Sequence, residues 1–160
     1  HLTQLTGTEF LEFVDRWITN NLDKISKMWP QKGGWEEWAK TDLYSMIITI
    51  DSTYDILREQ PVFLNNRELA DFLLNHSYPL NERVVIEMKC QSFENYKNFK
   101  KGLEEDIQKM GRLKDEYRQS TQIVLGIYFT EHRNEIPDYF STKIYGDGEI
   151  GLCWAVNEGN

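Results

Sequence analysis

The chain has 160 residues, of which 40% are hydrophobic, and a net charge of -8. Its length and apolar content suffice for one core but not for two domains. It contains no apolar stretch of the roughly 20 residues that a membrane-spanning helix needs, and its first residues lack the basic-then-apolar order typical of a signal peptide. We therefore expect one soluble domain over residues 1–160, whose negative charge argues against a polyanionic partner except near residues 61–118, which carry 10 of the 18 basic residues.

The first third of the chain predicts two helices. Residues 6–9 (Thr-Gly-Thr-Glu) have the spacing of a capping box, and apolar residues then recur at helical spacing to about Trp29. We expect residues 1–29 to form an N-terminal helical extension. A second helix is predicted to begin at Trp35, although the β-branched residues 47–50 leave a strand open as the alternative there.

The middle of the chain predicts strands around one long helix. Residues 61–74 resemble a hairpin that turns at Asn65-Asn66 and leads to a strand over 83–91. Apolar residues at helical spacing over 93–117 predict an amphipathic helix, and the apolar run 122–129 predicts a strand covered on both faces. A strand, a helix and a strand in this order favour a right-handed parallel crossover.

The end of the chain, residues 131–160, predicts a short helix near 135–140 and a hairpin that turns at 146–148. The fold class is therefore α/β (α+β), with a mixed central sheet flanked by helices. Two cysteines, Cys90 and Cys153, are expected to be free and buried, because two residues make no disulfide framework.

The most informative segment is the predicted strand over residues 83–91, which carries Glu87 and Lys89 among apolar residues. Strand side chains alternate between faces, so Glu87, Lys89 and Gln91 share one face while Met88 and Cys90 lie on the other. A buried charge without a partner costs several kcal/mol, so this pair requires a reason. The alternative is a solvated strand face with an ordinary cross-strand ion pair.

Asp71 lies in the preceding apolar strand, and antiparallel pairing would place it beside Glu87. Two converging carboxylates repel unless a cation lies between them, and hard oxygen ligands suit Mg²⁺ or Mn²⁺. The carbonyl of Met88 is a candidate third ligand. Lys89, on the same face, is placed to orient water and to stabilise charge on a phosphate. This set predicts phosphodiester hydrolysis.

The pattern of Asp71, then Glu87-x-Lys89, resembles the PD-(D/E)xK nuclease superfamily over roughly residues 35–130. The resemblance implies a restriction endonuclease-like core in which these three side chains bind the divalent metal and activate water to cleave DNA or RNA. The family's proline before the first acid is absent, and Ala70 stands in its place. The family often adds an acid from the helix before the sheet, for which Asp42 is the candidate, and Gln91 is expected to support the ligands without binding the ion.

The run over residues 87–92 also resembles the nuclease domains of contact-dependent inhibition and other polymorphic bacterial toxins. That likeness implies delivery from another cell, a cytoplasmic site of action, and a cognate immunity or inhibitor protein as partner. The rival prediction is a non-catalytic binding module on the same fold, such as an acidic inhibitor, antitoxin or immunity-type protein. The net charge favours the module, and the intact set of two acids and a lysine favours the nuclease.

Overall fold

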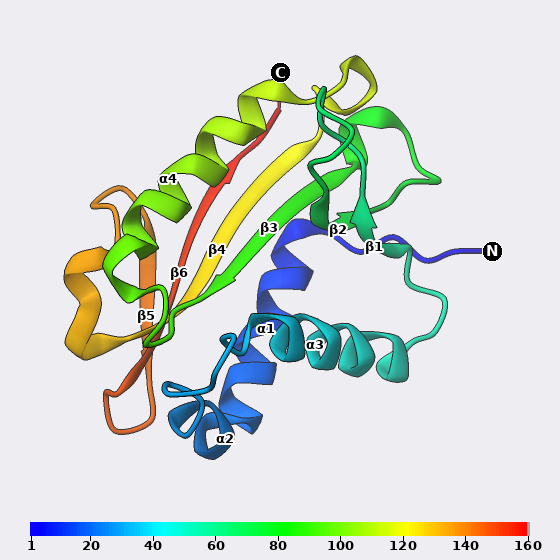
Figure 1. The fold of residues 1–160 in the computed structure, drawn as a ribbon. Helices are drawn as coiled ribbons and strands as arrows, with labels where there is room; N and C mark the ends of the chain where they lie inside the picture. The colour runs from blue at the N-terminus through cyan, green and yellow to red at the C-terminus, as the bar shows by residue number, and fades with distance from the viewer. Residues whose placement is uncertain (160) are drawn as a thin grey trace.

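A six-stranded mixed sheet forms the centre of the fold in the computed structural model, which describes residues 1–159 (Figure 1). The strands lie in the order β1-β2-β3-β4-β6-β5. Only β3 and β4 are parallel, and the other neighbours are antiparallel. The strands are β1 (Ile56–Gln60), β2 (Ala70–Leu74), β3 (Val84–Cys90), β4 (Thr121–Phe129), β5 (Ser141–Tyr145) and β6 (Ile150–Asn157).

Helices cover both faces of this sheet. Figure 1 shows α4 on one face and α1 and α3 on the opposite face, with α4 making the predicted crossover between β3 and β4. None of the helices in the described part of the chain is both long and apolar enough to cross a membrane. The helices are α1 (Gly7–Asn20), α2 (Leu22–Ser26), α3 (Glu36–Ile50) and α4 (Phe99–Lys109).

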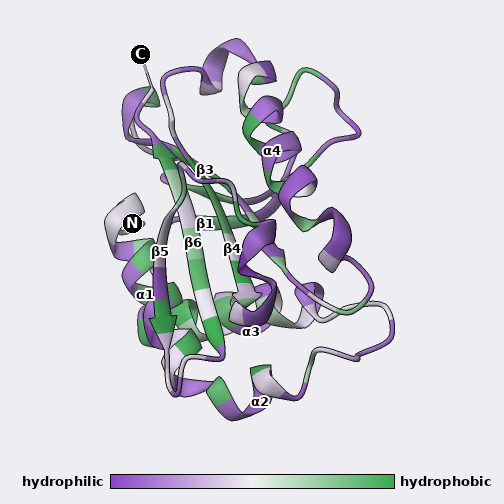
Figure 2. Ribbon diagram, turned by 90° about the vertical axis from the view of Figure 1, so that its left-hand side faces the viewer, coloured by the Kyte–Doolittle hydropathy of each residue, from purple (hydrophilic) through white to green (hydrophobic). Residues whose placement is uncertain are grey.

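The two faces of β3 belong to two different cores, as strand alternation predicts. Val84, Ile86, Met88 and Cys90 pack with α1 and α3, whereas Val85 packs with α4. In Figure 2 the hydrophobic colouring is strong on the inner strands β4 and β6, whereas β5 and most of α4 are hydrophilic. Glu87 and Lys89 therefore share the face that α4 covers.

The N-terminal region differs from the prediction in two ways. Asn21 leaves helical geometry, with φ -121° and ψ 16°, so one long helix to Trp29 is replaced by α1 and the short α2. α1 is also no extension, because four of its side chains are buried in the core shared with α3 and the sheet. At residues 47–50 the helix prevails over the strand alternative, since α3 continues to Ile50.

Three other boundaries differ from the prediction. β1 begins at Ile56, so the hairpin turns through a wide loop over residues 61–69 rather than at Asn65-Asn66. This loop folds against the chain after α4, where Phe63 bridges Leu113, and α4 therefore ends at Lys109 and is followed by 3₁₀ turns. The predicted short helix near 135–140 is replaced by a 3₁₀ segment at Thr130–Glu135, and the C-terminal hairpin and the two free, buried cysteines are confirmed.

Candidate active site

The candidate site begins where β3 continues past its neighbour β2. The last paired position between them is Phe72 with Ile86, so the edge of β3 beyond that point has no strand beside it. Carboxylates take the place of the missing strand. Oδ2 of Asp71 accepts a hydrogen bond from the Met88 N–H at 2.8 Å, and Oε1 of Glu36 accepts one from the Cys90 N–H at 3.0 Å.

The arrangement at this edge also shows where the three predicted metal ligands lie. Asp71 comes one residue before the last paired position of β2, and its carboxyl group is close enough to Glu87 to raise the pKa of that acid. The N–H and C=O of one strand residue point toward the same edge, so the carbonyl of Met88 also faces Asp71. Asp71, Glu87 and the Met88 carbonyl are therefore close together at the edge of β3.

The second oxygen of each edge carboxylate faces the ammonium group of Lys40. Lys40 Nζ lies 2.7 Å from Oδ1 of Asp71 and 3.1 Å from Oε2 of Glu36, with Glu37 at 3.4 Å. Lys40 is only 5% exposed. Burial acts to lower its pKa, but the charges of Asp71 and Glu36 outweigh burial and hold the pKa above the ordinary lysine value.

Glu87 is the most strongly perturbed acid of the site. It is buried, and its Oε1 accepts a hydrogen bond from Lys109 Nζ at 2.6 Å. Burial first, and then the nearby carboxyl groups of Asp71 and Asp106, raise its pKa to about 9, against the opposing effect of Lys109. Glu87 and Asp71 thus interact closely enough that, without a cation between them, a proton on Glu87 relieves their repulsion.

Lys89 lies between this strand and α4. Its Nζ is 3.5 Å from Oδ2 of Asp106, and the pKa of Asp106 is raised to about 6 by burial despite the lysine charge. The side chain of Lys89 passes beneath Gly102, where an added Cβ would lie 3.0 Å from Lys89 Cε. The glycine therefore leaves the room that the lysine occupies.

Together these residues form a charged cluster of four acids and three lysines. Carboxylate oxygens of this kind suit Mg²⁺ or Mn²⁺, and the ammonium of Lys40 already stands as a cation between two of the acids. Within the described residues no three acids, histidines or cysteines converge into a ready-made metal group. The cluster comprises Glu36, Lys40, Asp71, Glu87, Lys89, Asp106 and Lys109.

Two residues named from the sequence are not part of this cluster. The carboxylate of Asp42 accepts a hydrogen bond from the Trp17 indole at 2.8 Å, so its place on the helix stripe is explained by α1 and not by a metal. Gln91 is fully buried and locks β3 to β4, because its Oε1 accepts from the Phe129 N–H at 2.9 Å. It stabilises the strand ends, and its side-chain hydrogen bonds within the described residues go to the backbone of Phe129 and His132 and not to the charged side chains.

Four cluster residues were not named from the sequence, and each had a usable signal. Glu36 lies one helical turn before Lys40, and Lys40 lies beside Ala39 on the buried stripe of α3. Asp106 follows Leu103 by three residues, which places an acid on the buried face of α4. Lys109 follows Asp106 by three residues as well. A charge on the buried stripe of a helix was therefore the signal for Lys40 and Asp106, and a charge one turn away from such a residue was the signal for Glu36 and Lys109.

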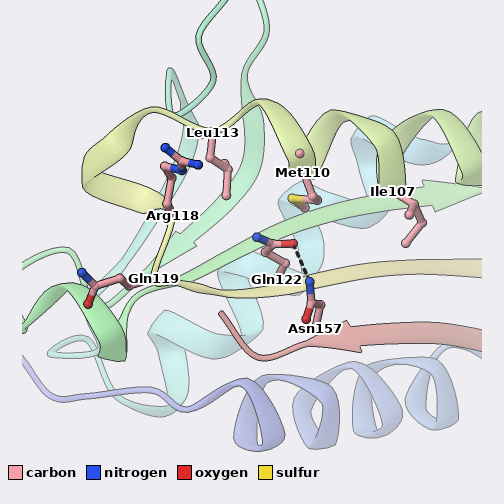
Figure 3. A pocket seen from close by; sticks show the side chains of 8 residues that line it. Ile107, Met110, Leu113, Arg118, Gln119, Gln122 and Asn157 are labelled. Carbon is pink, nitrogen blue, oxygen red and sulfur yellow. Dashed lines mark hydrogen bonds between the residues drawn. The ribbon is translucent and has the colours of Figure 1, made fainter. Parts of the chain in front are cut away.

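The larger hollows of the surface lie elsewhere. Figure 3 shows one of about 520 Å³, in which Ile107 and Met110 face Gln122 and Asn157 across the opening. The side chains of Gln122 and Asn157 are joined by a hydrogen bond of 3.4 Å. None of the residues that line this hollow belongs to the charged cluster.

Comparisons of this chain with protein-family models, with curated proteins and with solved structures find no significant match. The chemistry of the charged cluster therefore rests on its own geometry. Two features of that geometry bear on the predicted pattern. Asp71 and Glu87 come from neighbouring strands and their carboxyl groups interact, and Lys89 follows Glu87 by two residues on the same strand.

The raised pKa of Glu87 predicts that the metal-free protein loses stability as the pH rises. Between an ordinary carboxyl pKa near 4.5 and about 9, the folded state keeps a proton that the unfolded state releases. The free energy of unfolding should therefore fall with pH in this window, by at most about 1.4 kcal/mol per pH unit. Urea unfolding in EDTA from pH 6.5 to 8.5 measures this slope. The free energy of unfolding of Glu87→Gln should depend less on pH. Equal slopes in the two proteins would contradict the assignment.

Proposed function

We propose that this protein is a metal-dependent nuclease that hydrolyses phosphodiester bonds of DNA or RNA. One observation carries the proposal: two acids from adjacent strands, Asp71 and Glu87, interact at the edge of β3, with Lys89 two residues further along that strand. Asp71, Glu87 and the Met88 carbonyl would hold Mg²⁺ or Mn²⁺, with Glu36 as a further carboxylate on the side of the site where Lys40 lies. The ion would supply a Lewis acid for a phosphate oxygen and for the attacking water.

The roles of the protein groups follow from their surroundings. Lys89 is surrounded by Asp106, Glu36 and Glu87, which raise its pKa although burial opposes them. It therefore carries a positive charge, with which it orients water and stabilises the negative charge that develops on the phosphate. Asp106 holds the ammonium in position from α4. Glu36 is the acid from the helix before the sheet, in the role first assigned to Asp42.

Basic residues next to the site support a phosphate substrate. Lys100 and Lys101 are exposed on the first turn of α4, directly before Gly102, against which Lys89 packs. Phosphates of a bound strand would meet these side chains while one phosphodiester reaches Lys89. The other basic residues of this region are partly neutralised, since Arg112 pairs with Glu68 and Arg118 with Asp115.

The experiment is cleavage of plasmid DNA and of a structured RNA by the purified protein, with Mg²⁺, Mn²⁺ or EDTA. We expect cleavage of one substrate with either metal and none in EDTA, and an Asp71→Ala protein prepared in parallel controls for contaminating nucleases. No cleavage of either substrate with any metal would contradict the proposal. The rival binding module, favoured by the net charge of -8, would instead keep its partner affinity in Asp71→Ala, Glu87→Ala and Lys89→Ala.

Gly102→Ala is expected to separate stability from activity. A glycine inside a helix costs roughly 0.5–1 kcal/mol relative to alanine, so the substitution should leave the protein equally stable or more stable. The new Cβ, 3.0 Å from Lys89 Cε, should displace the lysine and lower the cleavage rate by roughly tenfold. Urea unfolding and single-turnover cleavage measure the two effects. Gly111→Ala is the control, because a Cβ there meets nothing within 4 Å, and full activity in Gly102→Ala would contradict the role of the glycine.

A further inference from the structure

Lys40 is the one lysine in the cluster that bridges acids from different elements. Its ammonium lies against Asp71 of β2 and Glu36 of α3, at 2.7 and 3.1 Å. Lys109 and Lys89 each have one carboxylate partner among the ion pairs of the described residues, at 2.6 and 3.5 Å. Lys40 therefore occupies a position at which two carboxylate groups converge.

The two carboxylates at this position are oriented by the strand edge. One oxygen of each accepts a hydrogen bond from a backbone N–H of β3. Asp71 accepts from Met88, and Glu36 accepts from Cys90. The other oxygen of each is directed to Lys40. Because the backbone fixes the first oxygen, the second oxygens converge on one point whichever cation is there. An ammonium and a hydrated divalent ion compete for such a point.

An exposed acid, Glu37, also lies beside the Lys40 ammonium. Glu37 Oε1 lies 3.4 Å from the ammonium, and the Glu37 side chain is 73% exposed. The flexible lysine stem can therefore turn toward Glu37 and solvent while remaining paired with an acid. The ammonium does not have to be left buried without a partner, which would be costly.

We propose that the Lys40 ammonium holds the place of the divalent cation in the metal-free protein and moves out toward Glu37 when the cation binds. The inference rests on the metal site proposed above and adds a positioning role for Lys40. Lys40 keeps Asp71 and Glu36 aligned on the strand edge until the metal enters. The same contact weakens metal binding, because two ion pairs must break to admit the ion.

The first test uses the unaltered protein. Acetylation of lysines by an N-hydroxysuccinimide ester, read by mass spectrometry, reports the accessibility of each amine with and without Mn²⁺. We expect Lys40 to be protected without metal and its labelling rate to rise at least roughly tenfold with Mn²⁺. Lys143, whose side chain is 54% exposed and paired with Asp15, should be labelled equally in both states.

The second test measures Mn²⁺ affinity in Lys40→Met, which removes the ammonium and keeps an unbranched stem. Calorimetry should show binding at least roughly tenfold tighter than in the unaltered protein. Lys143→Met is the matched control, since its ion pair of 2.7 Å lies outside the cluster, and its affinity should not change. If Lys40→Met does not fold, the labelling experiment still decides.

The outcomes separate this inference from the proposed function. Mn²⁺ binding without a change in Lys40 labelling, or with unchanged affinity in Lys40→Met, would overturn the displacement while leaving the metal site intact. No Mn²⁺ binding by either protein would overturn both. Increased Lys40 labelling on Mn²⁺ binding, together with tighter binding by Lys40→Met, supports the displacement.

Discussion

Glu87→Gln is expected to lower metal-dependent cleavage about 10³-fold without lowering the stability at neutral pH, which should rise because the folded protein no longer has to keep a proton on this side chain. Glutamine keeps an oxygen that accepts from Lys109 and has the shape of the neutral acid that burial favours. It lacks the anionic oxygen that a divalent ion requires. Single-turnover cleavage at saturating Mg²⁺ and urea unfolding at pH 7 measure the two properties in the same preparation.

The control for this prediction is Glu131→Gln. Glu131 is 80% exposed and lies outside the charged cluster, so its neutralisation should change neither the cleavage rate nor the stability. A Glu87→Gln protein that cleaves at close to the normal rate would show that this carboxylate is no metal ligand. A large loss of stability would instead show that Glu87 is ionised in the metal-free fold.

Lys40→Met is expected to lower the free energy of unfolding of the metal-free protein by about 3–5 kcal/mol. The substitution leaves the carboxylates of Asp71 and Glu36 facing each other in a largely buried position without a counterion. Breaking a buried pair by removing one partner is costly for this reason. Urea unfolding in EDTA at pH 7 measures the effect.

Two further variants test whether the loss of stability comes from the buried ion pairs of Lys40. Lys143→Met breaks an exposed pair of the same length, 2.7 Å, and should lose no more than about 1 kcal/mol. Adding Asp71→Asn to Lys40→Met removes one of the two stranded charges and should recover part of the loss, which a double-mutant cycle quantifies. Equal losses in Lys40→Met and Lys143→Met would contradict the buried ion-pair network.

The sheet and the strand residues of the site were predictable from the sequence because strand alternation is a short-range property. The acid and lysine of β3 stand two residues apart in an apolar run, which places both on one face. The parallel crossover followed from the order of strand, helix and strand. The closeness of Asp71 to Glu87 required only antiparallel pairing of the two strands.

The helical residues of the site were harder to predict, because their partners come from distant parts of the chain. Asp42 lies on an apolar stripe, but the N–H group that satisfies it belongs to Trp17, 25 residues earlier. Lys40 and Glu36 find their partners on β2 and β3. Helical periodicity shows that a charge is buried and leaves open which group compensates it.

The extent of α4 shows the same limit. The apolar spacing that continues to Tyr117 predicted a long helix, yet the chain leaves the helix after Lys109. The later apolar residues are buried all the same, because Leu113 meets Phe63 from the loop between β1 and β2. The periodic pattern therefore identified Met110, Leu113 and Tyr117 as buried, although Phe93 at its start is exposed, and tertiary contacts decided the backbone conformation.

Anomalous diffraction from crystals of the protein soaked in Mn²⁺ shows directly whether Asp71 and Glu87 bind one divalent ion. We expect one peak within about 2.1 Å of carboxylate oxygens of both Asp71 and Glu87, the distance at which Mg²⁺ binds oxygen, with the Lys40 ammonium moved away. No peak at these carboxylates in crystals that hold Mn²⁺ elsewhere would contradict the account.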